Sequence, residues 1–369
     1  MAQLGLFEIA TPPHSYSVAV TPEVERALAD HAPVAIGVSG GKDSSAVAIR
    51  TFEYLDDCGH RGPRLLLHCD LGEIEWLESL PTCERLAASL GTELLVLRRG
   101  AGGLLARWRQ RWEHNKQRYA NLECVRVIMP WSSAAARFCT SELKTTIACR
   151  ALAKRFVGRP ILSVTGIRGA ESAARSKAPV CTPQERLVRK RAGTSGWDWH
   201  PILHWSHAEV FAFLRERNQT LHAAYSVYGC SRVSCAFCVL SSAADLAAAS
   251  RCESNQNVYR HLVALEAESS FSFQRGRWLA DIAPHLLSAD LARRLARAKD
   301  VARQREALES QIPDGLLLSK GVPGRLPTRS EAELLASIRR EMSALLGFNV
   351  GYKSPEEVLT RYGQLLSGT

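Results

Sequence analysis

The stretch at residues 34–45, VAIGVSGGKDSS, constrains the fold more than any other part of the sequence. Its first half is an apolar run typical of a buried parallel strand, and its second half predicts a tight turn that opens a helix at about Asp43. Glycines adopt backbone angles that other residues avoid, so the amides of Gly40 and Gly41 can converge on a phosphate at the positive end of that helix. Lys42 adds a mobile positive charge. The stretch therefore predicts an anion site at the end of a buried strand.

The rest of the first 200 residues alternates between strand and helix patterns. Apolar runs at residues 65–69, 93–97 and 160–165 predict three more strands, and the segments 43–57, 74–90 and 102–149 between them have helical patterns. This alternation predicts an α/β fold with a doubly wound parallel sheet, in which ligands bind beyond the carboxyl ends of the strands. Asp70 and Gly166 each follow such a strand end.

The remaining segments predict a loop followed by helices. The basic stretch 175–196 predicts an exposed loop or insertion near the active site, and Ser206 with Glu209 has the spacing of a capping box for a helix over 206–217. From Ala243 onward we expect only helices, with a break at 312–327 and a last helix opened by Ser354 and Pro355. The predicted domains are residues 1–242 and a helical C-terminal region, 243–369.

Composition limits the location and the partners of the chain. No apolar run approaches the roughly 20 residues that span a bilayer, and the N-terminus lacks a basic region followed by an apolar stretch, so we expect a cytoplasmic protein without a membrane partner. A formal net charge of +10 favours an anionic partner such as nucleic acid or nucleotide. The 11 cysteines in a reducing compartment suggest metal binding or thiol chemistry.

Three cysteines cluster in the segment YGCSRVSCAFCVL, at positions 230, 235 and 238. Converging thiolates bind zinc or an iron–sulfur cluster, and either site needs a fourth ligand. Cys139 and Cys252 are the candidates, and spacing does not choose between them. Buried or incidental cysteines are the structural alternative.

Four segments in order carry a family resemblance: SGGKDS at 39–44, HCDLGE at 68–73, FCTSELK at 138–144 and GIRGAESAAR at 166–175. Together they resemble the phosphoadenosine phosphosulfate reductase family, within the adenine nucleotide alpha hydrolase superfamily, whose members cleave ATP between its α and β phosphates at a PP-loop. The resemblance implies Cys139 as the fourth ligand and a [4Fe–4S] cluster, with zinc as the alternative.

The resemblance also bears on the reaction. Sulfonucleotide reductases of this family carry a cysteine in a C-terminal tail, whereas this sequence has none after Cys252, and Thr140 stands where a Cys-Cys pair would place its second cysteine. The pattern is most similar to the DNA phosphorothioation sulfur-transfer branch of the Dnd or Ssp type. That branch implies an ATP pyrophosphatase and sulfurtransferase whose partners are DNA, a cysteine desulfurase and other modification-complex subunits. A thiolase acting on tRNA or a small molecule, a divergent sulfonucleotide reductase and a non-catalytic nucleotide sensor are the alternatives.

The resemblance assigns roles to individual residues. Lys42 neutralises charge on the leaving pyrophosphate, and Asp43 either holds Mg²⁺ or stabilises the start of its helix. Lys42, Asp43 and Arg168 form the expected catalytic set. The residues expected to contact the pyrophosphate, adenosine or other phosphates of ATP are Ser39, Gly40, Gly41, Ser44, Asp70, Gly166, Arg168 and Arg175. The expected metal ligands are Cys139, Cys230, Cys235 and Cys238.

Two basic segments are candidates for DNA contact. Residues 106–119 mix arginines with Trp108, Trp112 and Tyr119, and the second cluster comprises Arg186, Arg189, Lys190 and Arg191. Cations interleaved with aromatic rings are typical of stacking on single-stranded nucleic acid. An amphipathic helix with a solvated basic face, and a loop that covers the nucleotide, explain the same residues equally well.

Overall fold

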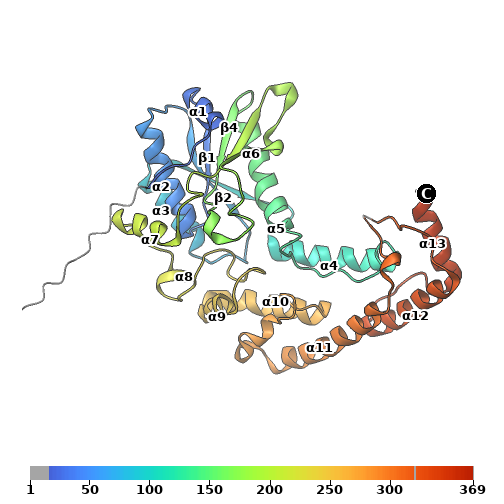
Figure 1. The fold of residues 1–369 in the computed structure, drawn as a ribbon. Coiled ribbons are helices and arrows are strands. Elements are labelled where there is room, and N and C mark those ends of the chain that lie inside the picture. Colours follow the sequence, from blue (N-terminus) through green and yellow to red (C-terminus); the bar gives the residue numbers. More distant parts are fainter. Residues whose placement is uncertain (1–15, 320, 369) are drawn as a thin grey trace, which may run out of the picture. The chain divides into compact units, whose positions relative to one another are not determined.

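The computed structural model describes residues 16–319 and 321–368, and it divides into two compact units (Figure 1). The sheet unit comprises the described residues up to Asp70 together with Leu77–Arg99 and Thr140–Ser234. The helical unit comprises Leu71–Trp76, Gly100–Cys139 and the described residues from Cys235 onward. The boundary thus differs from the expected division at residue 242, because two internal segments of the first 242 residues pack with the C-terminal helices.

A six-stranded sheet forms the centre of the sheet unit, in the order β3-β2-β1-β4-β6-β5. Every pairing is parallel except that of the edge strand β5 with β6. The strands are β1 (Val34–Gly37), β2 (Arg64–Asp70), β3 (Glu93–Arg98), β4 (Pro160–Val164), β5 (Cys181–Pro183) and β6 (Ser195–Trp199). The strand order reverses at β1 and β4, which confirms the predicted doubly wound fold and places its ligand crevice beyond these two strands.

Helices cover both faces of this sheet. Ile36 in β1 packs into the core on one face, whereas its neighbour Ala35 packs on the other face with Leu152 and Phe156. The first face is covered by α1 (Pro22–Ala29), α2 (Lys42–Asp57), α3 (Ser79–Ser89) and α7 (His207–Glu216), and the second by α6 (Thr146–Arg155) (Figure 1). Burial on both faces explains why β1 reads as a continuous apolar run.

The helical unit is built around aromatic side chains. Trp108 contacts Trp131 and Phe273 edge-on, with ring centroids 5.4 and 5.9 Å apart. Glu266 is fully buried, and its carboxylate accepts hydrogen bonds from three backbone amides, including that of Phe273 at 2.7 Å. The helices are α4 (Leu104–Ala120), α9 (Ala243–Arg251), α10 (Gln256–Ser269), α11 (Ala289–Ser310), α12 (Arg329–Leu346) and α13 (Pro355–Ser367). They confirm the predicted helical C-terminal region.

Three predicted elements differ from the structure. The helix expected over 74–90 begins at Ser79. Residues 121–137 contain no helix, and the left-handed φ of 51° at Leu122 ends the helical path just after α4. The stretch 175–196, expected as a loop, contains β5 and the start of β6. The capping box at Ser206 and the helix start at Ser354 are confirmed. None of the described helices has the length and apolar character that crossing a membrane requires.

Candidate active site

The loop between β1 and α2 has the geometry that the glycine pair predicts. Gly40 adopts a φ of +75°, and a Cβ there would lie 3.1 Å from the carbonyl oxygen of Ser79, so only glycine fits without strain. The hydroxyl of Ser44 accepts a hydrogen bond from the Ser39 amide at 3.2 Å and donates one to the Gly41 carbonyl at 2.8 Å. Ser44 therefore holds the loop closed from inside.

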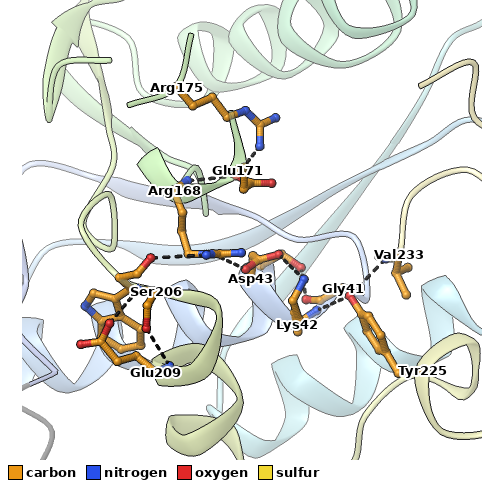
Figure 2. A network of polar contacts seen from close by, with 12 residues as sticks. Gly41, Lys42, Asp43, Arg168, Glu171, Arg175, Ser206, Glu209, Tyr225 and Val233 are labelled. Carbon is orange, nitrogen blue, oxygen red and sulfur yellow. Dashed lines mark hydrogen bonds and ion pairs between the residues drawn. The ribbon is translucent and has the colours of Figure 1, made fainter. Parts of the chain in front are cut away.

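Charged side chains gather at the start of α2. Asp43 lies between two cations, with Lys42 Nζ at 3.0 Å from one carboxylate oxygen and Arg168 Nε at 2.6 Å from the other (Figure 2). Both cationic side chains are only 4% exposed. Glu171 accepts a hydrogen bond from the Arg168 amide at 3.0 Å and pairs with Arg175. This cluster holds three cations against two carboxylates, and its excess positive charge suits an anionic ligand.

Gly166 joins this cluster through backbone packing. A Cβ at Gly166 would lie 2.6 Å from the carbonyl oxygen of Asp43, so only glycine lets the end of β4 approach the first turn of α2 so closely. The close approach brings Arg168, two residues later, to the Asp43 carboxylate. The structure thus brings Lys42, Asp43 and Arg168 together, as the sequence predicts.

A tyrosine that the sequence analysis did not identify lies over the loop. The hydroxyl oxygen of Tyr225, in α8 (Ala223–Ser226), accepts hydrogen bonds from the Lys42 amide at 3.2 Å and the Val233 amide at 3.1 Å (Figure 2). Burial raises the pKa of Tyr225 to about 12, so the hydroxyl stays neutral. Lys42 Nζ lies 5.5 Å from the Tyr225 ring centroid and 5.8 Å from that of Phe211. Sequence spacing gives no signal for this contact, since Tyr225 lies far from the loop along the chain.

A mostly apolar pocket of about 350 Å³ lies beside the loop. Ser39 belongs to both the pocket and the loop, and the volume of the pocket falls within the range of small-molecule sites. Burial raises the pKa of Asp198 at the pocket wall and lowers that of His200, whose Nδ1 lies 2.9 Å from the Thr165 hydroxyl oxygen. The other lining residues are Ala35, Gly37, Val38, Leu67, Cys69, Thr140, Lys144, Thr145, Ala148, Cys149, Leu152, Ser163, Val164 and Ile167.

The pocket includes some residues that the sequence analysis singled out and omits others. Thr140 and Lys144 come from the FCTSELK segment, where a π-helix (Ser141–Thr145) turns the chain, a feature frequent at functional sites. Asp70 ends β2 but does not line the pocket, and its carboxylate lies 2.5 Å from Arg98 Nε. Gly166 is also absent from the lining. The expected framing of adenosine by Asp70 and Gly166 therefore gains no support from this pocket.

The predicted metal ligands are divided between the units. Cys230 belongs to the sheet unit, whereas Cys139, Cys235 and Cys238 belong to the helical unit. Over residues 16–319 and 321–368, no group of three or more His, Cys, Asp or Glu side chains is arranged to hold a metal ion. Cys252, the rival fourth ligand, lies at the end of α9 with its sulfur 3.2 Å from the Ser254 hydroxyl. The [4Fe–4S] cluster, like Mg²⁺ at Asp43, stays a prediction from the sequence.

The two candidate DNA-contact segments differ in exposure. Trp108, Trp112 and Tyr119 are at most 2% exposed, so the expectation that these rings stack on nucleic acid is wrong: their apolar rings form the core of the helical unit. The second cluster is exposed. Arg189, Lys190 and Arg191 line a hollow on the sheet unit together with two cations of α6, Arg150 and Lys154.

Comparison with known proteins finds a matching family and a related solved structure. One solved structure with a similar chain path is a phosphoadenylyl-sulfate (PAPS) reductase from Candida auris in complex with phosphate, at 15% identity over 57% of this chain and 94% of that chain. Its TM-score of 0.35 is too low to support an argument about this chain. No curated protein sequence matches. The model of the phosphoadenosine phosphosulfate reductase domain matches residues 33–240, which is more than half of the sequence. On the strength of that match, the chain belongs to the phosphoadenosine phosphosulfate reductase domain family.

Proposed function

We propose that this protein cleaves ATP between its α and β phosphates and uses the adenylyl group to activate a DNA backbone phosphate for replacement of one oxygen by sulfur. The observation that carries the proposal is the buried cluster at the start of α2. Lys42, Asp43 and Arg168 meet there with excess positive charge, directly after a glycine loop at the start of a helix, the arrangement that binds phosphate in other proteins.

The neighbouring pocket supports a nucleotide rather than free phosphate as the ligand. Its apolar wall suits a nucleoside, and Ser39 belongs to both the pocket and the loop. A nucleotide with its base in the pocket would therefore direct its phosphates toward Gly40 and Gly41. Lys42 and Arg168 would stabilise the charge that develops on departing pyrophosphate, since fixed charges in a buried site act strongly on a transition state.

The two substitutions at phosphorus balance without a redox step. An oxygen of the DNA phosphodiester attacks the α phosphorus of ATP, and the bond to pyrophosphate breaks. Sulfur at the oxidation level of hydrosulfide then attacks the DNA phosphorus and displaces AMP. The displaced oxygen leaves with AMP, and a phosphorothioate remains. A cysteine desulfurase is the proposed source of sulfur, which it delivers as a persulfide. A thiol reductant releases the outer sulfur of that persulfide as hydrosulfide and forms a disulfide.

Two features of the chain support DNA as the sulfur acceptor. The formal net charge is +10, and the hollow formed by α6 and residues 188–192 has five cations but no acidic residue in its lining. Cationic surfaces of this kind bind the phosphate backbone without reading sequence.

A second candidate follows from the family itself. The same pocket and loop would accept a sulfonucleotide such as phosphoadenylyl sulfate, the substrate class named by the matching family. Reduction of that substrate oxidises two thiols to a disulfide and releases sulfite, so its products differ from those of ATP cleavage.

The test measures pyrophosphate release from ATP, with and without DNA, by the full-length protein purified without oxygen. We expect Lys42→Ala to lower the rate about 100-fold or more, as removal of one charge-stabilising group typically does. Lys177→Ala is the control, because Lys177 is exposed in the same unit and outside the cluster. Equal rates for wild type and Lys42→Ala would refute the catalytic assignment.

Product analysis then separates the candidate acceptors. Phosphorothioate dinucleotides in digested DNA would support the proposal. Thiolated tRNA would move the acceptor to RNA, and sulfite formed from phosphoadenylyl sulfate would favour the reductase.

A further inference from the structure

The Tyr225 hydroxyl occupies an acceptor position that phosphate-binding loops leave for their ligand. The amide of Lys42 is the first of α2, and the first amides of a helix have no partner within the helix. In anion-binding loops such amides point at a phosphate oxygen. Here the Lys42 amide donates to Tyr225 Oη instead, at 3.2 Å (Figure 2).

The surrounding space leaves no room for both acceptors. A Cβ added at Gly41 would lie 3.4 Å from the Val233 carbonyl oxygen and 3.5 Å from Tyr225 Oη, so the 222–234 segment packs directly on the loop. The Lys42 side chain is 4% exposed, with the rings of Tyr225 and Phe211 beside its ammonium group. A phosphate can reach the Lys42 amide only after the tyrosine hydroxyl has left.

We infer that Tyr225 is a displaceable cap on the phosphate loop, which the phosphates of the nucleotide expel. The inference rests on the proposed function in one respect, that this loop takes a phosphate. Expulsion removes the acceptor of the Val233 amide as well, since one hydroxyl oxygen serves both amides. Binding of phosphate therefore frees the 222–234 segment from the Lys42 amide and breaks the hydrogen bond between Val233 and Tyr225 within that segment.

The released segment carries one of the clustered cysteines. The Cys230 amide donates to the carbonyl oxygen of Ala224 at 2.7 Å, and Ala224 adjoins Tyr225 in α8. Moving Tyr225 therefore moves the attachment of Cys230. Through this contact, occupancy of the phosphate loop is transmitted to the segment that carries Cys230.

The first test is a calorimetric titration of the full-length protein with pyrophosphate. Tyr225→Phe keeps the ring and removes the acceptor, so phosphate no longer competes with two hydrogen bonds. We expect the variant to bind pyrophosphate about tenfold more tightly than wild type, from the usual strength of such bonds. Tyr54→Phe is the matched control, because Tyr54 lies on α2 far from the first turn of that helix. The Tyr54→Phe variant should bind pyrophosphate with the affinity of wild type.

The second test is hydrogen exchange in wild type with and without pyrophosphate. The Val233 amide should exchange faster when pyrophosphate is bound, while the amides of residues 40–42 become more protected. A purely structural role for Tyr225 would leave Val233 unchanged or better protected. Wild type and Tyr225→Phe binding pyrophosphate equally, with Val233 exchange unaltered, would overturn the cap and leave the proposed function standing. If neither wild type nor Tyr225→Phe binds pyrophosphate or ATP, both the cap and the proposed function are overturned.

Discussion

Replacing Gly166 with alanine tests whether the close approach of β4 to α2 assembles the active site. The added Cβ would lie 2.6 Å from the Asp43 carbonyl oxygen, 2.8 Å from its carbonyl carbon and 3.2 Å from the Ser44 amide nitrogen. All three are backbone atoms, so no side-chain rotation relieves the contact. The end of β4 and the first turn of α2 must move apart by several tenths of an ångström.

The loss of stability expected for Gly166→Ala follows from these contacts. Overpacking of this kind costs about 1–3 kcal/mol, and a loss near the middle of that range corresponds to a fall of roughly 4–8 °C in the unfolding temperature of a unit of this size. The same displacement separates Arg168 from Asp43, which are now 2.6 Å apart. We therefore expect Gly166→Ala to lose pyrophosphate release at temperatures where the protein is still folded.

Gly169→Ala is the matched control, three residues along the same loop. Its nearest neighbours would be 3.4 Å from the new Cβ, which is ordinary contact. We expect its unfolding temperature to equal or slightly exceed that of wild type, because alanine restricts the unfolded chain. Thermal unfolding followed by circular dichroism, together with the pyrophosphate assay, measures both effects. If Gly166→Ala matches Gly169→Ala in unfolding temperature and in pyrophosphate release, the close approach of β4 to α2 has no role in assembling the site.

Three further predictions concern the core, the basic hollow and pH. Trp108→Ala should destabilise the helical unit by about 3–5 kcal/mol, as truncation of a buried aromatic does, and leave DNA affinity unchanged below the unfolding temperature; a selective loss of DNA binding would contradict its assignment to the core. Neutralising Arg189, Lys190 and Arg191 together should weaken DNA binding and lower the slope of log affinity against log salt by up to about 3, and an unchanged slope would exclude the hollow as a DNA site. Burial raises the pKa of Glu266 from 4.5 to about 7, so the folded state binds the extra proton. This group's contribution to stability is therefore present below about pH 4.5 and is lost as pH rises to about 7. The free energy of unfolding of Glu266→Gln, measured by chemical denaturation between pH 5 and 7, should not fall in this way. A pH dependence identical to that of wild type would refute the raised pKa of Glu266.

Much of the sheet unit could be predicted because its signals are local. The apolar run of β1, the glycine pair and the following helix are encoded in twelve consecutive residues, and the structure forms them where the sequence places them. The missed strand β5 and the start of β6 lie in a stretch rich in arginine and lysine. β6 forms by pairing with β4, and β5 by pairing with β6, contacts that local composition does not reveal.

The site was predictable only in part, for a related reason. Lys42 and Asp43 are adjacent in sequence, and the family resemblance identifies Arg168. Tyr225 and His200 enter the site from segments without a motif, and only tertiary packing brings them there. The aromatic residues of α4 show the opposite error. Alternating cations and rings suggested a binding surface, but on a helix the rings share one face, and that face is buried.

The interleaving of the two units along the chain has a consequence for synthesis on the ribosome. Trp108 leaves the ribosome long before Phe273, its partner in the helical core, and the segments 71–76 and 100–139 lie between parts of the sheet unit. Neither unit can complete its core from one continuous stretch of nascent chain. Apolar surface of α4 therefore stays uncovered until the C-terminal helices emerge, and a chain stopped near residue 242 would expose it permanently. Such a fragment should aggregate or recruit chaperones rather than persist as a working sheet unit.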